Sequence, residues 1–181
     1  MAVRRRAAWL AAALLLSGAA AAQAAVGEVT PAHACAALEG DGLAMGPWTT
    51  GDDAFGERIT VRNFRCLSEP LVIPGGEGRF VTTINYYVEG RLHTRVETIR
   101  LVLNVHRPKT RAAGLERFVK LADALFAKLG LEPPPGLDVA LERAQPASWR
   151  RDYGGVRFEI WKSPIERLRL TLDLAPGRPG A

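Results

Sequence analysis

The fold is decided by residues 110–130, which read TRAAGLERFVKLADALFAKLG. Six apolar side chains recur here at the spacing of one helix face: Leu115, Phe118, Ala122, Leu125, Phe126 and Leu129. Gly130 can take the left-handed conformation that ends a helix, and Leu131 can fold back on Phe126. The pattern predicts an amphipathic helix over 110–129 with one buried face.

Strand patterns lie on both sides of this helix. Downstream, apolar and polar residues alternate over 156–161 and again over 167–174, with a turn at 163–165. A short helix is expected over 136–144 and a further short strand over 147–152. Upstream, strands are expected over 58–67, 79–88 and 92–106, with bulges near Asn63 and near residues 97–98 that keep the apolar residues on one face. A short helix over 31–39 precedes them, and residues 68–78 form a connection.

The element order is therefore α-β-β-β-α-α-β-β, with one extra short strand as an alternative. Long amphipathic helices that cover one face of an antiparallel sheet define an α+β fold. We expect a single α+β domain over residues 25–175, followed by a flexible tail over 176–181. A chain of this length is long enough for one hydrophobic core.

The first 24 residues have the three parts of a secretory signal peptide. Arg4, Arg5 and Arg6 form the positive start, an apolar run follows over 7–22, and Ala22-Gln23-Ala24 gives a small-x-small cleavage site. We expect the mature protein to begin at Ala25, with an uncut N-terminal anchor as the alternative. No later apolar stretch reaches the roughly 18 residues that span a bilayer, so no membrane span is expected after signal removal.

The charge of the chain argues against a nucleic-acid partner. The full sequence has 24 Lys and Arg residues and 19 Asp and Glu residues, for a net charge of +5. Three of those arginines and none of the acids lie in the leader, so residues 25–181 carry only +2. Arginine outnumbers lysine 20 to 4, a bias that we interpret as typical of GC-rich bacterial genomes.

Cys35 and Cys66 are the only cysteines. An even count in an exported chain predicts a disulfide between them. The alternative is a pair of free thiols in a redox or metal site, but the chain has no C-x-x-C pattern and no third ligand near either cysteine.

Motifs for catalysis, metals and cofactors are missing from the sequence. His33, His93 and His106 lack the spacing of a zinc motif, and no serine lies in a Gly-x-Ser-x-Gly elbow. The glycine-rich segment over 75–78 lacks the Lys-Ser/Thr of a phosphate loop. We therefore expect no catalytic residue, no metal and no cofactor.

The most coherent polar surface is predicted on the hairpin formed by 79–88 and 92–106. A three-residue turn at 89–91 would place Tyr87 opposite His93, Asn85 opposite Arg95, and Thr83 opposite Glu97. Tyr87 and Arg95 should then be accessible to solvent. These side chains could bind an acidic or sugar-like ligand. The alternative is an ordinary solvated sheet face with a Tyr–His contact and an Arg–Glu ion pair.

These features predict an exported, soluble, non-catalytic protein of the bacterial cell envelope, periplasmic or secreted, that binds an envelope protein or serves as an accessory domain. A periplasmic small-ligand-binding protein that uses Tyr87, His93, Arg95, Asn85 and Glu97 is the second hypothesis. An envelope hydrolase is the third. The oligomeric state is left open by the sequence.

Overall fold

The computed structural model describes residues 29–50, 63–75 and 80–175 of the chain. Within these residues, eight strands form one antiparallel sheet in the order β1-β2-β4-β5-β8-β7-β6, and β3 pairs with β4. The predicted α+β class is confirmed. The predicted signal peptide, the tail over 176–181 and the predicted strand residues 58–62 lie outside the described residues.

The chain first forms a short helix, one 3-10 turn and five strands. Their bounds are α1 Pro31–Ala36, the turn Glu39–Asp41, β1 Thr49–Thr50, β2 Phe64–Leu67, β3 Leu71–Val72, β4 Thr83–Gly90 and β5 Thr98–Val105. After a second 3-10 turn, two helices and three strands complete the described fold. Their bounds are Pro108–Thr110, α2 Arg111–Leu129, α3 Leu137–Glu142, β6 Ala147–Arg151, β7 Gly154–Trp161 and β8 Glu166–Leu174.

Strand β3 lies in a segment that we predicted to be a connection, so that prediction was wrong for two residues. β2 pairs with β4 only from Tyr87 to Gly90, which leaves the other half of that β4 edge available. Leu71 and Val72 pair there with Ile84 and Thr83. The backbone groups of β4 thereby find partners along most of the strand.

The β4–β5 hairpin differs from the prediction. Strand β5 begins at Thr98, which pairs with Glu89, and not at residue 92. Residues 91–97 form the turn, in which Leu92 and Arg95 make an isolated bridge. A Cβ on Gly90 would lie 2.0 Å from the Arg95 carbonyl oxygen, so the chain can fold back this closely only at a glycine. The predicted three-residue turn and the predicted bulge near residues 97–98 were both wrong.

Helix α2 agrees closely with its sequence pattern. Five of the six predicted stripe residues are buried, and the sixth, Leu115, is half-buried against the core. Gly130 has a φ of 64°, and the Leu131 N–H donates to the Phe126 carbonyl over 3.0 Å. These are the features of the predicted glycine stop. The helix begins at Arg111, one residue after its predicted start.

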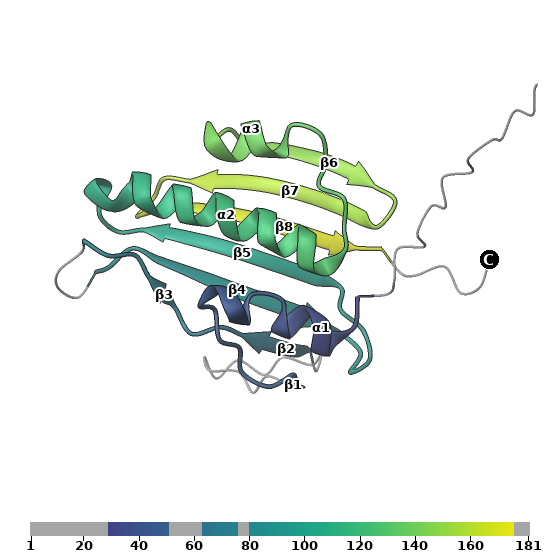
Figure 1. The fold of residues 1–181 in the computed structure, drawn as a ribbon. Coiled ribbons are helices and arrows are strands. Elements are labelled where there is room, and N and C mark those ends of the chain that lie inside the picture. Colours follow the sequence, from purple (N-terminus) through teal and green to yellow (C-terminus); the bar gives the residue numbers. More distant parts are fainter. Residues whose placement is uncertain (1–28, 51–62, 76–79, 176–181) are drawn as a thin grey trace, which may run out of the picture.

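All three helices lie on the same face of the sheet (Figure 1). Phe118 of α2 contacts Phe158 of β7 with ring centroids 6.2 Å apart. The Tyr86 hydroxyl of β4 donates to the Ala34 carbonyl of α1 over 2.8 Å. The side chains of the central strands that point to the helices form the core. The opposite sheet face carries no helix of the described residues.

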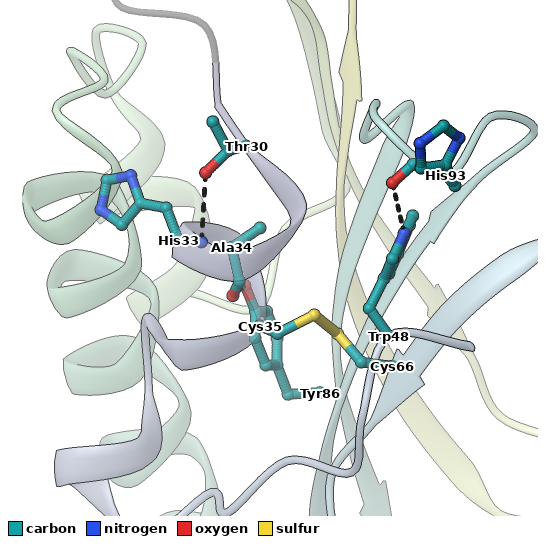
Figure 2. The surroundings of a disulfide bond; sticks show 8 residues. All are labelled: Thr30, His33, Ala34, Cys35, Trp48, Cys66, Tyr86 and His93. Atoms are coloured by element: carbon teal, nitrogen blue, oxygen red, sulfur yellow. Dashed lines mark hydrogen bonds between the residues drawn. A yellow bond between two sulfur atoms is a disulfide. The ribbon is translucent and has the colours of Figure 1, made fainter.

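The predicted disulfide joins helix α1 to strand β2. Cys35 and Cys66 are bonded, with an S–S distance of 2.02 Å and Cα atoms 6.1 Å apart (Figure 2). Thr30 caps α1, because its side chain accepts from the His33 N–H. His33 Nε2 in turn donates to the Lys128 carbonyl in the last turn of α2, over 2.7 Å. The first helix is thus fixed to both the sheet and the long helix.

An acidic contact between α2 and α3 predicts a dependence of stability on pH. Burial, and then the charges of Asp138 and Glu142, raise the pKa of Asp123. A carboxyl with a raised pKa binds its proton more tightly in the folded state. The contribution of Asp123 to the free energy of unfolding is therefore most favourable at acid pH, and it is lost as the pH rises through the raised pKa.

Asp123→Asn should therefore stabilise the protein at pH 7. Asp123 is exposed, so we expect a gain of no more than about 0.5 kcal/mol, the size of an exposed charge pair. The gain should shrink toward zero as the pH falls below about 3.9, the ordinary pKa of an aspartate, because Asp123 then becomes protonated in the unfolded state as well. Urea denaturation of both proteins between pH 3.5 and pH 7 measures it. A variant less stable than the parent at pH 7 would contradict this interpretation.

Candidate binding surface

Side chains alternate between two environments along the central strands. In β4, Ile84, Tyr86 and Val88 are buried on the helix side, whereas Asn85 and Tyr87 are half-buried on the other side. We call the sheet face that points away from the helices the open face. Its central residues are Arg65, Leu67, Asn85, Tyr87, Glu89, Arg100, Val102, Asn104, Arg157, Glu159, Trp161, Arg167, Arg169, Thr171 and Asp173.

A shallow depression lies in the middle of the open face. It is lined by Arg65, Leu67, Tyr87, Glu89, Arg100, Val102, Asn104, Arg167 and Arg169. Strand pairing explains this set, because Tyr87 lies beside Arg100, Val102 beside Arg169, and Asn104 beside Arg167. Three strands, β2, β5 and β8, therefore place guanidinium groups around Tyr87 of β4.

The open face has an excess of positive charge. Arg65, Arg100, Arg157, Arg167 and Arg169 lie on it with Glu89, Glu159 and Asp173. Each of the three acids is already paired: Glu89 with Arg100 (2.7 Å), Glu159 with Arg169 (3.0 Å) and Asp173 with Arg157 (2.8 Å). Guanidinium groups bind carboxylates and phosphates through paired N–H donors. The face is suited to an acidic partner.

Arg167 differs from the other arginines of the open face. Its side chain is exposed, and its Nε donates to Asn104 Oδ1 over 2.8 Å. Within the described part of the chain it makes no ion pair. Its two terminal nitrogens therefore remain available to an incoming anion.

The field of these arginines reaches Tyr87. Burial raises the pKa of the Tyr87 hydroxyl, while the charges of Arg167 and Arg100 lower it and that of Glu89 raises it. The hydroxyl therefore stays protonated at neutral pH and can donate a hydrogen bond. Tyr87 adds a neutral donor beside the charged ones.

Arg169 is held in place by its neighbours. Its guanidinium carbon lies 4.4 Å from the ring centroid of Trp161, a cation–π distance. Arg169 Nε and the neighbouring Thr171 Oγ1 are buried and have no hydrogen-bond partner among the described residues. We assign Arg169 a structural role in the floor of the depression.

Two of the five predicted site residues lie on the open face. Tyr87 and Asn85 point away from the helices as predicted, and Asn85 Oδ1 accepts from Asn104 Nδ2 over 3.3 Å. Their predicted partners were wrong. Tyr87 pairs with Arg100 and not with His93, and Asn85 pairs with Val102 and not with Arg95.

The other three predicted residues lie in the 91–97 turn. The His93 ring packs against Phe64 at 6.0 Å, and its carbonyl accepts from Trp48 Nε1 over 2.8 Å (Figure 2). Glu97 pairs with Arg91 over 2.8 Å, so the predicted Arg95–Glu97 ion pair is replaced by another. Arg95 and Tyr87 are both half-buried, so neither is as accessible to solvent as predicted. The structure therefore does not bring these three side chains together with Tyr87 in one site.

Sequence reasoning did not connect Arg100, Arg167 and Arg169 with Tyr87. The alternation of arginine with leucine in β8 placed Arg167 and Arg169 on a polar face. These two arginines come close to Tyr87 only because β8 pairs with β5, a contact between segments that are far apart in the sequence.

Other kinds of site find little support within residues 29–50, 63–75 and 80–175. No three His, Cys, Asp or Glu side chains there are grouped so that they could hold a metal ion. None of the helices described is both long enough and apolar enough to cross a bilayer.

The fold and its open face define an α+β protein in which one antiparallel sheet is covered by helices on one side. The chain belongs to the DUF6030 family, described as a family of unknown function, whose model matches residues 19–179. No curated protein and no solved structure matches the chain.

Proposed function

We propose that this protein is exported to the bacterial cell envelope and acts there by binding an acidic partner on the open face, without catalysis of its own. The observation that carries the proposal is the cluster of arginines around the depression. Helices of the described chain cover only the other side of the sheet, so this face has room for a partner (Figure 1).

Two features support export. The leader has the charge pattern and cleavage site of a signal peptide. The Cys35–Cys66 bond belongs to the kind of crosslink that persists in oxidising compartments and is rare in the cytosol. A periplasmic or secreted location accounts for both.

The state of the acidic groups supports binding over catalysis. A carboxylate that acts as a general acid or base must be free to exchange a proton with the substrate. Glu89, Glu159 and Asp173 are instead held by arginines in ion pairs. The face thus offers donors to a ligand and no unpaired carboxylate of its own.

The second candidate function is the binding of a small ligand in the same depression. Its volume of about 430 Å³ is in the range of small-molecule sites. This version keeps Tyr87 from the sequence hypothesis and replaces His93, Arg95 and Glu97 by Arg100 and Arg167. Asn85 lies outside the lining and accepts a hydrogen bond from Asn104, which is part of it.

Co-purification with two charge-reversal variants tests the proposal. Arg167→Glu reverses the exposed charge of the depression, and Arg143→Glu makes the same change at the exposed end of α3, on the helix side. Tagged parent and variants are exported in the native bacterium and recovered from the periplasmic fraction. Mass spectrometry of the recovered protein should give the mass of a chain that begins at Ala25. A full-length chain found in the membrane fraction would show that the leader is retained as an anchor.

We expect the parent and Arg143→Glu to retain one common partner and Arg167→Glu to lose most of it. The loss should reach about tenfold or more, the effect of one charge-assisted contact. A protein in the complex supports the first candidate and a small molecule the second. Equal recovery from all three proteins would overturn the assignment of the open face.

A further inference from the structure

A second hollow adjoins the depression at the end of the sheet where β7 turns into β8. It is lined by Phe80, His106, Trp161, Ser163, Pro164, Ile165, Arg167 and Arg169. We call it the hairpin pocket. It shares Arg167 and Arg169 with the depression, so the two hollows are parts of one surface. Its volume of about 740 Å³ is in the range of ligand sites.

Flat apolar rings flank the hairpin pocket. Phe80 is 66% exposed and Trp161 is 38% exposed. The Phe80 ring stacks on His106 with centroids 6.0 Å apart and an interplanar angle of 28°. Large exposed aromatic side chains beside a pocket are typical of binding sites, because their faces gain from contact with a ligand ring.

A guanidinium with free donors lies in the same pocket. Arg169 is committed to Glu159 and to the Trp161 ring. Arg167 uses only its Nε within the described residues, on Asn104. Its terminal N–H groups can therefore take both oxygens of a carboxylate while the aromatic rings contact the body of the ligand.

We infer that the hairpin pocket binds a ring that carries a carboxylate, with Arg167 on the carboxylate and Phe80 on the ring face. The inference rests on the proposed function and names the ligand chemistry for part of the open face. Two sources share this chemistry, an acidic sugar unit of a glycan and a free aromatic acid.

Titration calorimetry on the processed protein, residues 25–181, tests the inference with four probes. Trigalacturonate and indole-3-acetate each carry a ring and a carboxylate. Maltotriose has rings without charge, and acetate has the charge without a ring. The variants are Arg167→Gln, Phe80→Ala and a matched control, Leu92→Ala. Leu92 is 55% exposed and lies in the β4–β5 turn, at the opposite end of the sheet from the hairpin pocket.

We expect at least one of the two ring acids to bind more tightly than both maltotriose and acetate. Arg167→Gln should weaken that binding about tenfold, as the loss of a charge-assisted hydrogen bond does. Phe80→Ala should weaken it by about threefold or more, the effect of one lost aromatic contact. Leu92→Ala should leave it unchanged. The preferred ring acid identifies the source as a glycan or an aromatic acid.

The inference is overturned if neither ring acid binds, if acetate binds as tightly as they do, or if Phe80→Ala has no more effect than Leu92→Ala. Failure here is distinct from failure of the proposed function. A partner that Arg167→Glu releases during co-purification would keep the open face as a binding surface even if no ring acid binds.

Discussion

We expect Phe118→Ala to lower the free energy of unfolding by about 3–5 kcal/mol, the cost of emptying a large buried aromatic site. The Phe118 side chain is completely buried in the centre of α2 and packs against Phe158 on β7. Its removal leaves a cavity between the long helix and the sheet. Urea denaturation followed by circular dichroism measures the change.

Lys120→Ala provides the matched control on the same helix. Lys120 pairs with Glu116 on the solvent side, over 2.7 Å. Loss of an exposed pair of this kind should leave the denaturation midpoint nearly unchanged. Equal denaturation midpoints for Phe118→Ala and the parent would show that this helix face is not packed on the sheet.

Removal of the disulfide should have the next largest effect. The Cys35–Cys66 bond spans 31 positions of the sequence, and closing a loop of that size stabilises a protein by about 3.7 kcal/mol in the chain-entropy estimate. We expect the double variant Cys35→Ala, Cys66→Ala to lose roughly that amount. Mass analysis of the parent without reductant should find no free thiol.

Treatment with a reductant distinguishes the stabilisation by the covalent bond from the stabilisation by packing of the two sulfur atoms. Dithiothreitol should destabilise the parent by nearly the same amount and should leave the double variant unaffected. If the oxidised parent and the double variant unfold at the same denaturant concentration, the bond does not stabilise the fold.

Helix α2 could be predicted because all of its signals are local. The spacing of its apolar residues, Gly130 and Leu131 together specify the helix and its end. The β7–β8 hairpin was predicted for the same reason, since alternation over two adjacent runs needs no distant partner. The disulfide could be predicted from two facts alone, the presence of only two cysteines and the inferred export to an oxidising compartment.

The register of the β4–β5 hairpin could not be predicted from alternation. Leu92 and Val96 continue an apolar alternation and resemble the start of a strand. In the structure Val96 is buried at the end of a wide turn and Leu92 is exposed. The close approach of Gly90 to the Arg95 carbonyl produces this turn, and it depends on three-dimensional contacts that periodicity does not encode.

The orientation of Tyr87 could be predicted from the sequence, but its charged neighbours could not. Strand parity correctly placed Tyr87 on the face opposite the core. Its charged neighbours come from β5 and β8, which are separated in the sequence by α2, α3, β6 and β7. Pairing over such a distance is a tertiary property, so only the structure shows that Arg100, Arg167 and Tyr87 share one surface.

Hydroxyl-radical footprinting of the purified protein, alone and with its co-purified partner, tests the central claim most directly. In the free protein Trp161 should be oxidised readily and the buried Tyr86 should be protected. The partner should then protect Trp161 and Tyr87, while Val139 on the helix side stays reactive. Protection of Val139 with no change at Tyr87 and Trp161 would place the binding surface on the helices and contradict the assignment of the open face.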